Sequence, residues 1–193
     1  MVPQKDTQVK KYVSTDTCRI MVYNPLLYMK KRAASPRAQG LLPLSLYRRL
    51  MDVGPLPTVD VLFFNSALTK TLLFKRAHKP LAGVYFSMGG HIRKNEKLLD
   101  AAIRQAFTET GIRIKKADLV FGGVQEEIHK DSIFPGVSYH SVDVFYGYVL
   151  TGAQLKNLHL DGQHSNAKWF SVSDRTLHPF IKTKLTSLLA AMR

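Results

Sequence analysis

One stretch of the chain, residues 89–112 (GGHIRKNEKLLDAAIRQAFTETGI), combines the residue types that metal-assisted phosphate chemistry uses. It opens with two glycines and a polar turn, and we expect a helix from about Glu96 to Thr110 that is closed by Gly111. The face expected to be free of the core carries polar residues: Glu96, Asp100, Arg104, Gln105, Thr108 and Glu109. A glycine turn followed by a helix with carboxylates is a common way to hold a divalent cation against a polyphosphate.

The spacing within this stretch is more specific than its composition. Gly90 is followed after five residues by Glu96 and after seven more by Arg104, and the stretch closes on Glu109, Gly111 and Ile112. This pattern resembles the Nudix box, G-x5-E-x7-R-E-U-x-E-E-x-G-U with U apolar. The chain is therefore identified as a member of the Nudix family; the alternative is an ordinary amphipathic helix with a solvated charged face.

Two carboxylates of the box are absent, because Gln105 and Thr108 stand where the pattern has glutamate. Pyrophosphate-cleaving Nudix enzymes collect two or three metal ions with the complete cluster. Glu109 alone cannot hold several Mg2+ ions, since each needs oxygen ligands and charge neutralisation. The sequence therefore predicts either a single-metal variant or an inactive site.

One branch of the family, the GDP-mannose mannosyl hydrolases, also lacks two box carboxylates. The chain resembles this branch from about residue 42 to its end, in features that occur in the same order: Leu56-Pro57 before Val59-Asp60-Val61, Lys75-Arg76 before Lys79-Pro80, His140 in a strand, Asp161-Gly162-Gln163-His164 before Trp169, and Leu177-His178-Pro179-Phe180. The resemblance implies hydrolysis of a GDP-sugar by water attack at the anomeric carbon, with one Mg2+ on the diphosphate that leaves.

The resemblance also implies a role for individual residues. His164 would be the catalytic base, Arg76 would neutralise the departing diphosphate, and Asp60 would lie near both. The Mg2+ ligands would be the backbone carbonyl of Gly89, the carboxylate of Glu109 and the side-chain amide oxygen of Gln163. Each of these residues also has a structural interpretation: a surface helix residue for Glu109, a loop pair for Gln163 and His164, a solvated charge for Arg76, and a buried strand residue for Asp60.

One departure from the branch bears on activity rather than on the fold. The branch usually has arginine directly after the two box glycines, where it touches the diphosphate, and this chain has His91, with Arg93 nearby. Both are candidates for substrate binding. A mostly neutral imidazole supplies less charge than a guanidinium, and losing one such contact costs roughly 2–4 kcal/mol of transition-state stabilisation.

Composition limits the classes of partner and compartment. The 193 residues carry 28 Lys and Arg against 14 Asp and Glu, a net charge of +14 that favours nucleotides, nucleic acid or an acidic surface. The single cysteine excludes an internal disulfide and fits a reducing compartment. Because no apolar run reaches about 18 residues and no secretory signal is evident, we expect no membrane span and a cytoplasmic protein, or an organelle such as the mitochondrion if the basic N-terminus is a presequence.

Two parts of the chain are expected: a basic N-terminal extension, residues 1–41, with eight Lys and Arg against two Asp, and a Nudix domain, residues 42–193. Relatives in the branch tend to be dimers, so the resemblance implies a homodimer. The alternative function is a catalytically weak or inactive Nudix module that binds nucleotide or RNA within a larger assembly.

Hydrophobic periodicity supplies the elements that must position these residues. We expect a helix over 42–53 with Leu46, Arg49, Leu50 and Val53 on one face, and a C-terminal helix over 179–192. Strands are expected over 58–64, 71–75, 119–127 and 138–150, with 58–64 central and 119–127 paired with 138–150. These elements predict an α/β fold, a mixed β-sheet between helices in an α/β/α sandwich.

Overall fold

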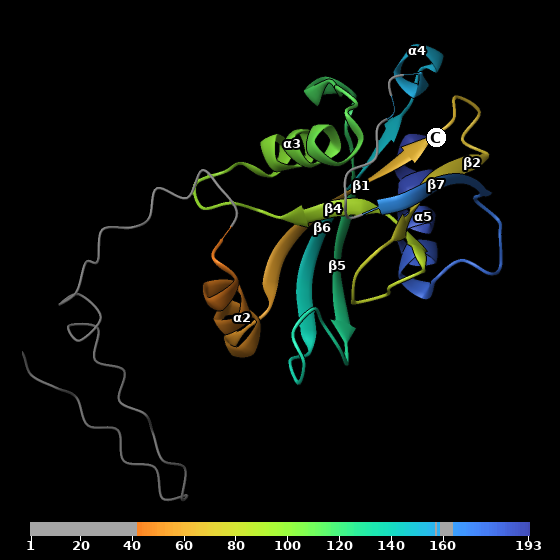
Figure 1. Ribbon diagram of the computed structural model, residues 1–193. Helices are drawn as coiled ribbons and strands as arrows, with labels where there is room; N and C mark the ends of the chain where they lie inside the picture. The colour runs from red at the N-terminus through yellow and green to blue at the C-terminus, as the bar shows by residue number, and fades with distance from the viewer. Residues whose placement is uncertain (1–41, 157, 159–163) are drawn as a thin grey trace, which may run out of the picture. The chain divides into compact units, whose positions relative to one another are not determined.

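The computed structural model describes residues 42–156, 158 and 164–193, with the backbone alone for residues 164 and 165. The predicted division at residue 41 stays a prediction, and Gln163 lies outside the described residues. The elements, drawn in Figure 1, are α2 (Leu44–Val53), β1 (Leu56–Phe64), β2 (Lys70–Arg76), β3 (Tyr85–Phe86), β4 (Met88–His91), α3 (Leu98–Thr110), the 3-10 helix η1 (Lys116–Asp118), β5 (Val120–His129), β6 (Tyr139–Val149), α4 (Gly152–Leu155), β7 (His164–Ser171) and α5 (Pro179–Met192).

The strands form one sheet of seven strands, and this sheet is mixed, as predicted from the sequence. Its order is β3-β2-β1-β6-β5, with β4 also paired to β1 and β7 to β2. Strands β1 and β6 run parallel, whereas β5 and β6 pair, as the sequence predicted, and run antiparallel. Strand β1 is central because its apolar residues are buried on both faces of the sheet.

Helices α3 and α5 cover opposite faces of this sheet (Figure 1). Side chains alternate along β1, so Val59, Val61 and Phe63 pack with α3, whereas Leu62 and Phe64 pack with α5. The α3 side is closed by small residues, Ala101, Ala102 and Ala106, and the α5 side by Ile181, Leu185 and Leu188. The predicted α/β/α sandwich is therefore confirmed, and each face can carry its own polar groups.

Helix α2 presents a different face from the predicted one. Tyr47 and Met51, one turn apart, point inward and pack with Leu56 and Val137. Val53 is 81% exposed, so the expected apolar face that includes it is wrong. In a helix of only ten residues, burying the larger Tyr47–Met51 pair outweighs burying the leucine stripe.

Helix α3 has the expected end and a later start. Gly111 closes it in the left-handed conformation (φ 69°), which glycine adopts without steric strain. The helix begins at Leu98 instead of Glu96, because the Glu96 carboxylate accepts a hydrogen bond from the Arg93 N–H within the preceding turn. In the described residues, every helix is too short or too polar to cross a bilayer.

Candidate active site

Residues of the glycine-helix stretch form a clamp between its loop and α3. The Arg104 guanidinium donates to both carboxylate oxygens of Glu96, at 2.6 and 2.8 Å, and to the backbone oxygen of His91 at 2.9 Å. Its remaining terminal nitrogen donates to Oε1 of Gln105 at 2.7 Å. The hydrogen bond from Arg104 is the main reason that the pKa of Glu96 is lowered. Glu96 and Arg104 thus hold the loop in place instead of facing a ligand.

The same stretch brings together two of the predicted metal ligands. Glu109, near the end of α3, is only 2% exposed, and its Oε2 accepts the backbone N–H of Gly89 at 3.1 Å. Gln105, one turn earlier, is also buried, and its amide packs against Gly90 so closely that a Cβ there would lie 2.0 Å from Nε2. The expectation that Gln105 and Glu109 lie on a free face is wrong, because this side of α3 rests on the glycines of β4.

These groups have the chemistry that a single Mg2+ requires. A carboxylate and a backbone carbonyl are hard oxygen donors, which this ion prefers. The backbone carbonyl belongs to position 89, which has to be glycine. A Cβ there would fall 2.1 Å from Oδ1 of Asp60 and 2.3 Å from the Val59 carbonyl oxygen. Gly89 and Glu109 therefore fit the metal site that the sequence predicts.

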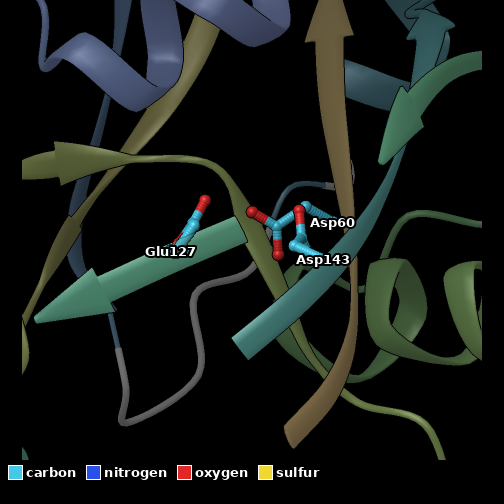
Figure 2. Close-up of side chains that lie close together, drawn as sticks. All are labelled: Asp60, Glu127 and Asp143. Carbon is cyan, nitrogen blue, oxygen red and sulfur yellow. The ribbon is translucent and has the colours of Figure 1, made fainter. Parts of the chain in front are cut away.

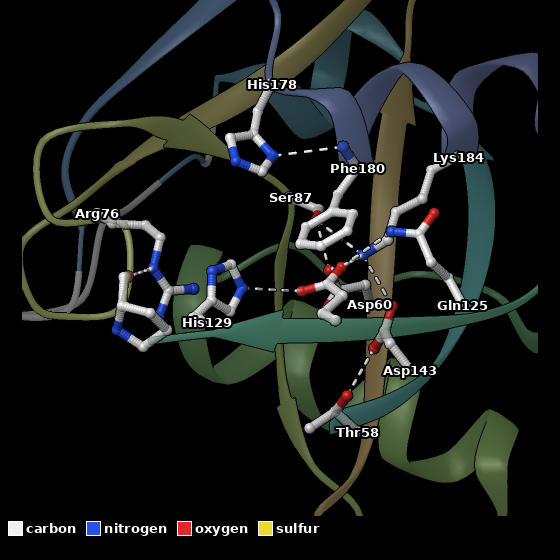
Figure 3. Close-up of polar contacts among 12 residues, drawn as sticks. Thr58, Asp60, Arg76, Ser87, Gln125, His129, Asp143, His178, Phe180 and Lys184 are labelled. Atoms are coloured by element: carbon white, nitrogen blue, oxygen red, sulfur yellow. Dashed lines mark hydrogen bonds and ion pairs between the residues drawn. The ribbon is translucent and has the colours of Figure 1, made fainter. Parts of the chain in front are cut away.

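Asp60 belongs to a buried charge cluster on the α5 side of the sheet. Figure 2 shows its carboxylate beside those of Glu127 and Asp143. Asp60 comes from β1, Glu127 from β5 and Asp143 from β6. The Lys184 ammonium, fully buried on α5, lies 2.6 Å from Asp60, 2.8 Å from Glu127 and 2.8 Å from Asp143 (Figure 3). Ser87 donates a further hydrogen bond to Asp60. Although three converging carboxylates are a common metal-binding arrangement, here the Lys184 ammonium already pairs with all three.

Sequence reasoning missed Lys184 and both of its partners on β5 and β6. A signal was present, because Lys184 lies among Ile181, Leu185 and Leu188, the residues of α5 that face the core. A lysine within an apolar stripe needs buried carboxylates. Which carboxylates these are depends on strand register, which the sequence pattern leaves open.

The members of this cluster differ in how their surroundings shift their pKa values. Burial, together with the charge of Asp60, raises the pKa of Asp143 to about 7 despite the opposing charge of Lys184. Burial also opposes ionisation of Lys184 and Glu127. The surrounding carboxylates nevertheless raise the pKa of Lys184, and His129, whose Nε2 lies 3.9 Å from Glu127, lowers the pKa of Glu127 together with the charge of Lys184.

Stability is therefore expected to depend on pH through Asp143. Because its pKa is raised from 3.8 to about 7, protonation of Asp143 stabilises the folded chain; this contribution is complete below pH 3.8 and is lost as the pH rises through about 7. In Asp143→Asn the contribution no longer varies, so the Tm of the variant relative to wild type should rise between about pH 5 and 8. Thermal unfolding across this range measures the difference. Parallel Tm profiles would contradict the prediction, and Asp52→Asn, which alters an exposed carboxylate on α2, is the control.

The predicted arginine and the predicted base come from adjacent strands. His164, the first residue of β7, is the backbone partner of Arg76 at the end of β2, where the pairing register shifts. The Arg76 Nε donates to the backbone oxygen of Pro80 at 2.9 Å, which fixes the direction of the guanidinium. The structure describes the backbone of His164 and not its side chain. The distance between the His164 side chain and Glu109 therefore lies outside what the structure describes.

His91 makes a contact that the sequence did not predict. Its Nε2 forms a 2.7 Å hydrogen bond with the hydroxyl of Tyr47 on α2, and the two rings meet edge to face with centroids 4.8 Å apart. Burial lowers the pKa of His91, so the imidazole is neutral at pH 7. The His91 imidazole thus binds the Tyr47 hydroxyl. Binding of substrate phosphate by His91 or by Arg93 stays a prediction.

Comparisons with known proteins agree with this fold. Residues 54–189 match the family model for the NUDIX domain. The low-salt glycan biosynthesis protein Agl8 of Haloferax volcanii is 31% identical over 135 residues, which cover 69% of this chain and 82% of that protein. The m7GpppN-mRNA hydrolase NUDT17 of Xenopus laevis is 32% identical over 95 residues, 48% of this chain and only 30% of that protein. The crystal structure of a MutT NUDIX hydrolase from Burkholderia pseudomallei superposes with a TM-score of 0.56 at 20% identity, covering 69% of this chain and 98% of the other.

Proposed function

Because the chain belongs to the Nudix hydrolase family, we propose that it hydrolyses a GDP-mannose-like nucleotide sugar with Mg2+, by water attack at the anomeric carbon, to release nucleoside diphosphate and free sugar. The observation that carries this proposal is the pairing of Glu109 with Gly89, without a second carboxylate at Gln105 or Thr108. The family uses divalent metals, and this donor set is suited to one ion.

Attack at phosphorus is disfavoured by what surrounds Gln105. Its amide oxygen accepts from Arg104 and its amide nitrogen packs on Gly90, so the side chain contributes no negative charge to the site. A second metal ion would need such a charge. Substitution at the sugar carbon needs fewer metal ions, because the reaction builds negative charge only on the leaving diphosphate and positive charge on the sugar.

The residues divide these two tasks. Bound Mg2+, held by Glu109, Gly89 and Gln163, would supply positive charge to the leaving diphosphate. Arg76 adds a second positive charge that persists at all working pH values. His164 takes the proton from the attacking water, a task suited to an imidazole near neutral pH. Asp60 is left out of these two tasks, since Lys184 and Ser87 already bind its carboxylate on the α5 side of the sheet.

The likeness to Agl8 supports a sugar-containing substrate, since that protein is named for glycan biosynthesis and the matched region covers most of its length. The likeness to NUDT17 concerns a smaller part of both chains.

The decisive experiment is hydrolysis of GDP-mannose with Mg2+ in 18O-labelled water. The proposal expects GDP and mannose as products, with the label in mannose, because the water oxygen bonds to carbon. Label in a phosphate group would show attack at phosphorus and overturn the proposed reaction. UDP-sugars, ADP-ribose and a cap analogue complete the panel; turnover of the last two alone would also contradict it.

A nucleotide- or RNA-binding module without turnover is the second candidate. Two observations favour it. The chain has a net charge of +14. The His91 imidazole is bound to the Tyr47 hydroxyl, so it is not available to a substrate phosphate. It predicts RNA binding whose log K falls linearly with log salt. Absence of RNA binding at low salt would remove this candidate.

A further inference from the structure

Helix α2 lies outside the matched family domain, since it spans Leu44–Val53 and the match begins at residue 54. It nevertheless reaches the strand that carries the two box glycines. The Tyr47 hydroxyl binds His91 at 2.7 Å, and the ring of Tyr47 also meets Phe134 with a centroid distance of 5.9 Å. Because Met51, one turn later, is buried against Leu56, the helix is anchored at two successive turns.

His91 is held from two sides as a result. Arg104 on α3 binds its backbone oxygen at 2.9 Å, and Tyr47 on α2 binds its imidazole. His91 ends β4, two residues after Gly89, and β4 pairs with β1 so that Gly89 lies opposite Asp60. The position of the Gly89 carbonyl therefore depends on how firmly the end of β4 is held.

We propose that Tyr47 is a positioning residue of the metal site, which acts through His91 to fix β4 and the Gly89 carbonyl. The inference rests on the proposed function in that it takes Gly89 as a ligand of Mg2+. A backbone carbonyl cannot adjust by side-chain rotation, so its placement is set by the strand. Mg2+ binds at 2.0–2.1 Å in near-ideal octahedral geometry and tolerates little displacement of a ligand.

This arrangement also gives His91 a reason to be histidine. An imidazole offers a ring edge for Tyr47 and a ring nitrogen for its hydroxyl within one short side chain. Position 91 therefore serves the attachment of α2, and the charge toward the diphosphate is left to Arg76.

The test is Tyr47→Phe in the full-length chain, because this change removes the hydroxyl and keeps the ring contacts. The measured quantity is the affinity for Mn2+ in the presence of GDP, followed by electron paramagnetic resonance, alongside Mg2+ activation of hydrolysis. We expect Mn2+ affinity to fall roughly tenfold, the scale for partners that orient a metal ligand, with Tm within about 3 °C of wild type. His91→Leu should give the same loss, and the double variant should lose no more than either single variant.

Tyr148→Phe is the matched control, since it also removes one tyrosine hydroxyl with a 3.0 Å hydrogen bond, in that case from Gln154. Equal Mn2+ affinity in Tyr47→Phe and wild type, whatever the change in Tm, would overturn the positioning role. Wild type that binds Mn2+ without hydrolysing any nucleotide sugar would defeat the proposed function and leave the Tyr47 comparison valid. Wild type that binds no Mn2+ would overturn the positioning role together with the metal site.

Discussion

Glu109→Gln is expected to lower kcat/KM for nucleotide-sugar hydrolysis by roughly 100- to 1000-fold, which corresponds to about 3–4 kcal/mol of transition-state stabilisation. Glutamine has the size of glutamate and its amide oxygen can still accept the Gly89 N–H, so the fold should be kept. The change removes the negative charge that a buried site needs to hold Mg2+. Steady-state kinetics at several Mg2+ concentrations, with Mn2+ binding as a second readout, would measure the effect.

The control for this variant is Glu126→Gln, which removes a carboxylate that is 64% exposed on β5 and should leave both readouts unchanged. Activity of Glu109→Gln within threefold of wild type would place the metal elsewhere. Loss of activity with unchanged Mn2+ affinity would instead show that Glu109 acts on the reaction by another route.

Lys184→Met is expected to destabilise the folded chain by about 3–5 kcal/mol, since it leaves three buried carboxylates without their cation. For a domain of this size the loss corresponds to a Tm lower by roughly 6–20 °C. Chemical and thermal unfolding at pH 7 would measure it. Part of the loss should be recovered at lower pH, because protonation of the carboxylates removes the uncompensated charge.

Lys182→Met provides the comparison on the same helix, because Lys182 is exposed and its loss should change stability by no more than about 0.5 kcal/mol. Adding Asp143→Asn to Lys184→Met should restore part of the stability, since it removes one of the three like charges. Equal stability of Lys184→Met and Lys182→Met would contradict the prediction and would show that the carboxylates take up protons once the ammonium is absent.

Local periodicity and motif spacing were enough to predict most of the fold. The bounds of α5 and the pairing of β5 with β6 follow from apolar residues at helical and strand spacing. The orientation of α2 did not follow, because its sequence offers two apolar faces and the choice depends on Phe134 and Val137, more than 80 residues away.

The site could be predicted only where its residues lie in one motif. The pairing of Gly89 with Glu109 is contained in the Nudix box, so its spacing could be recognised. The contact of His91 with Tyr47 joins residues 44 positions apart, and Lys184 is 124 positions from Asp60. Contacts of this kind depend on register and helix packing, which a single sequence specifies only weakly.

The buried Lys184 cluster has a consequence for the order in which the chain assembles. During synthesis, β1, β5 and β6 leave the ribosome before α5, so their three carboxylates are available for pairing before the only ammonium that contacts all of them, among the described residues, has emerged. Until that helix docks, the α5 side of the sheet is open to water, which solvates the three like charges. Final closure of that layer must therefore wait for residue 184 to emerge, which makes docking of the last helix a late event in cotranslational folding.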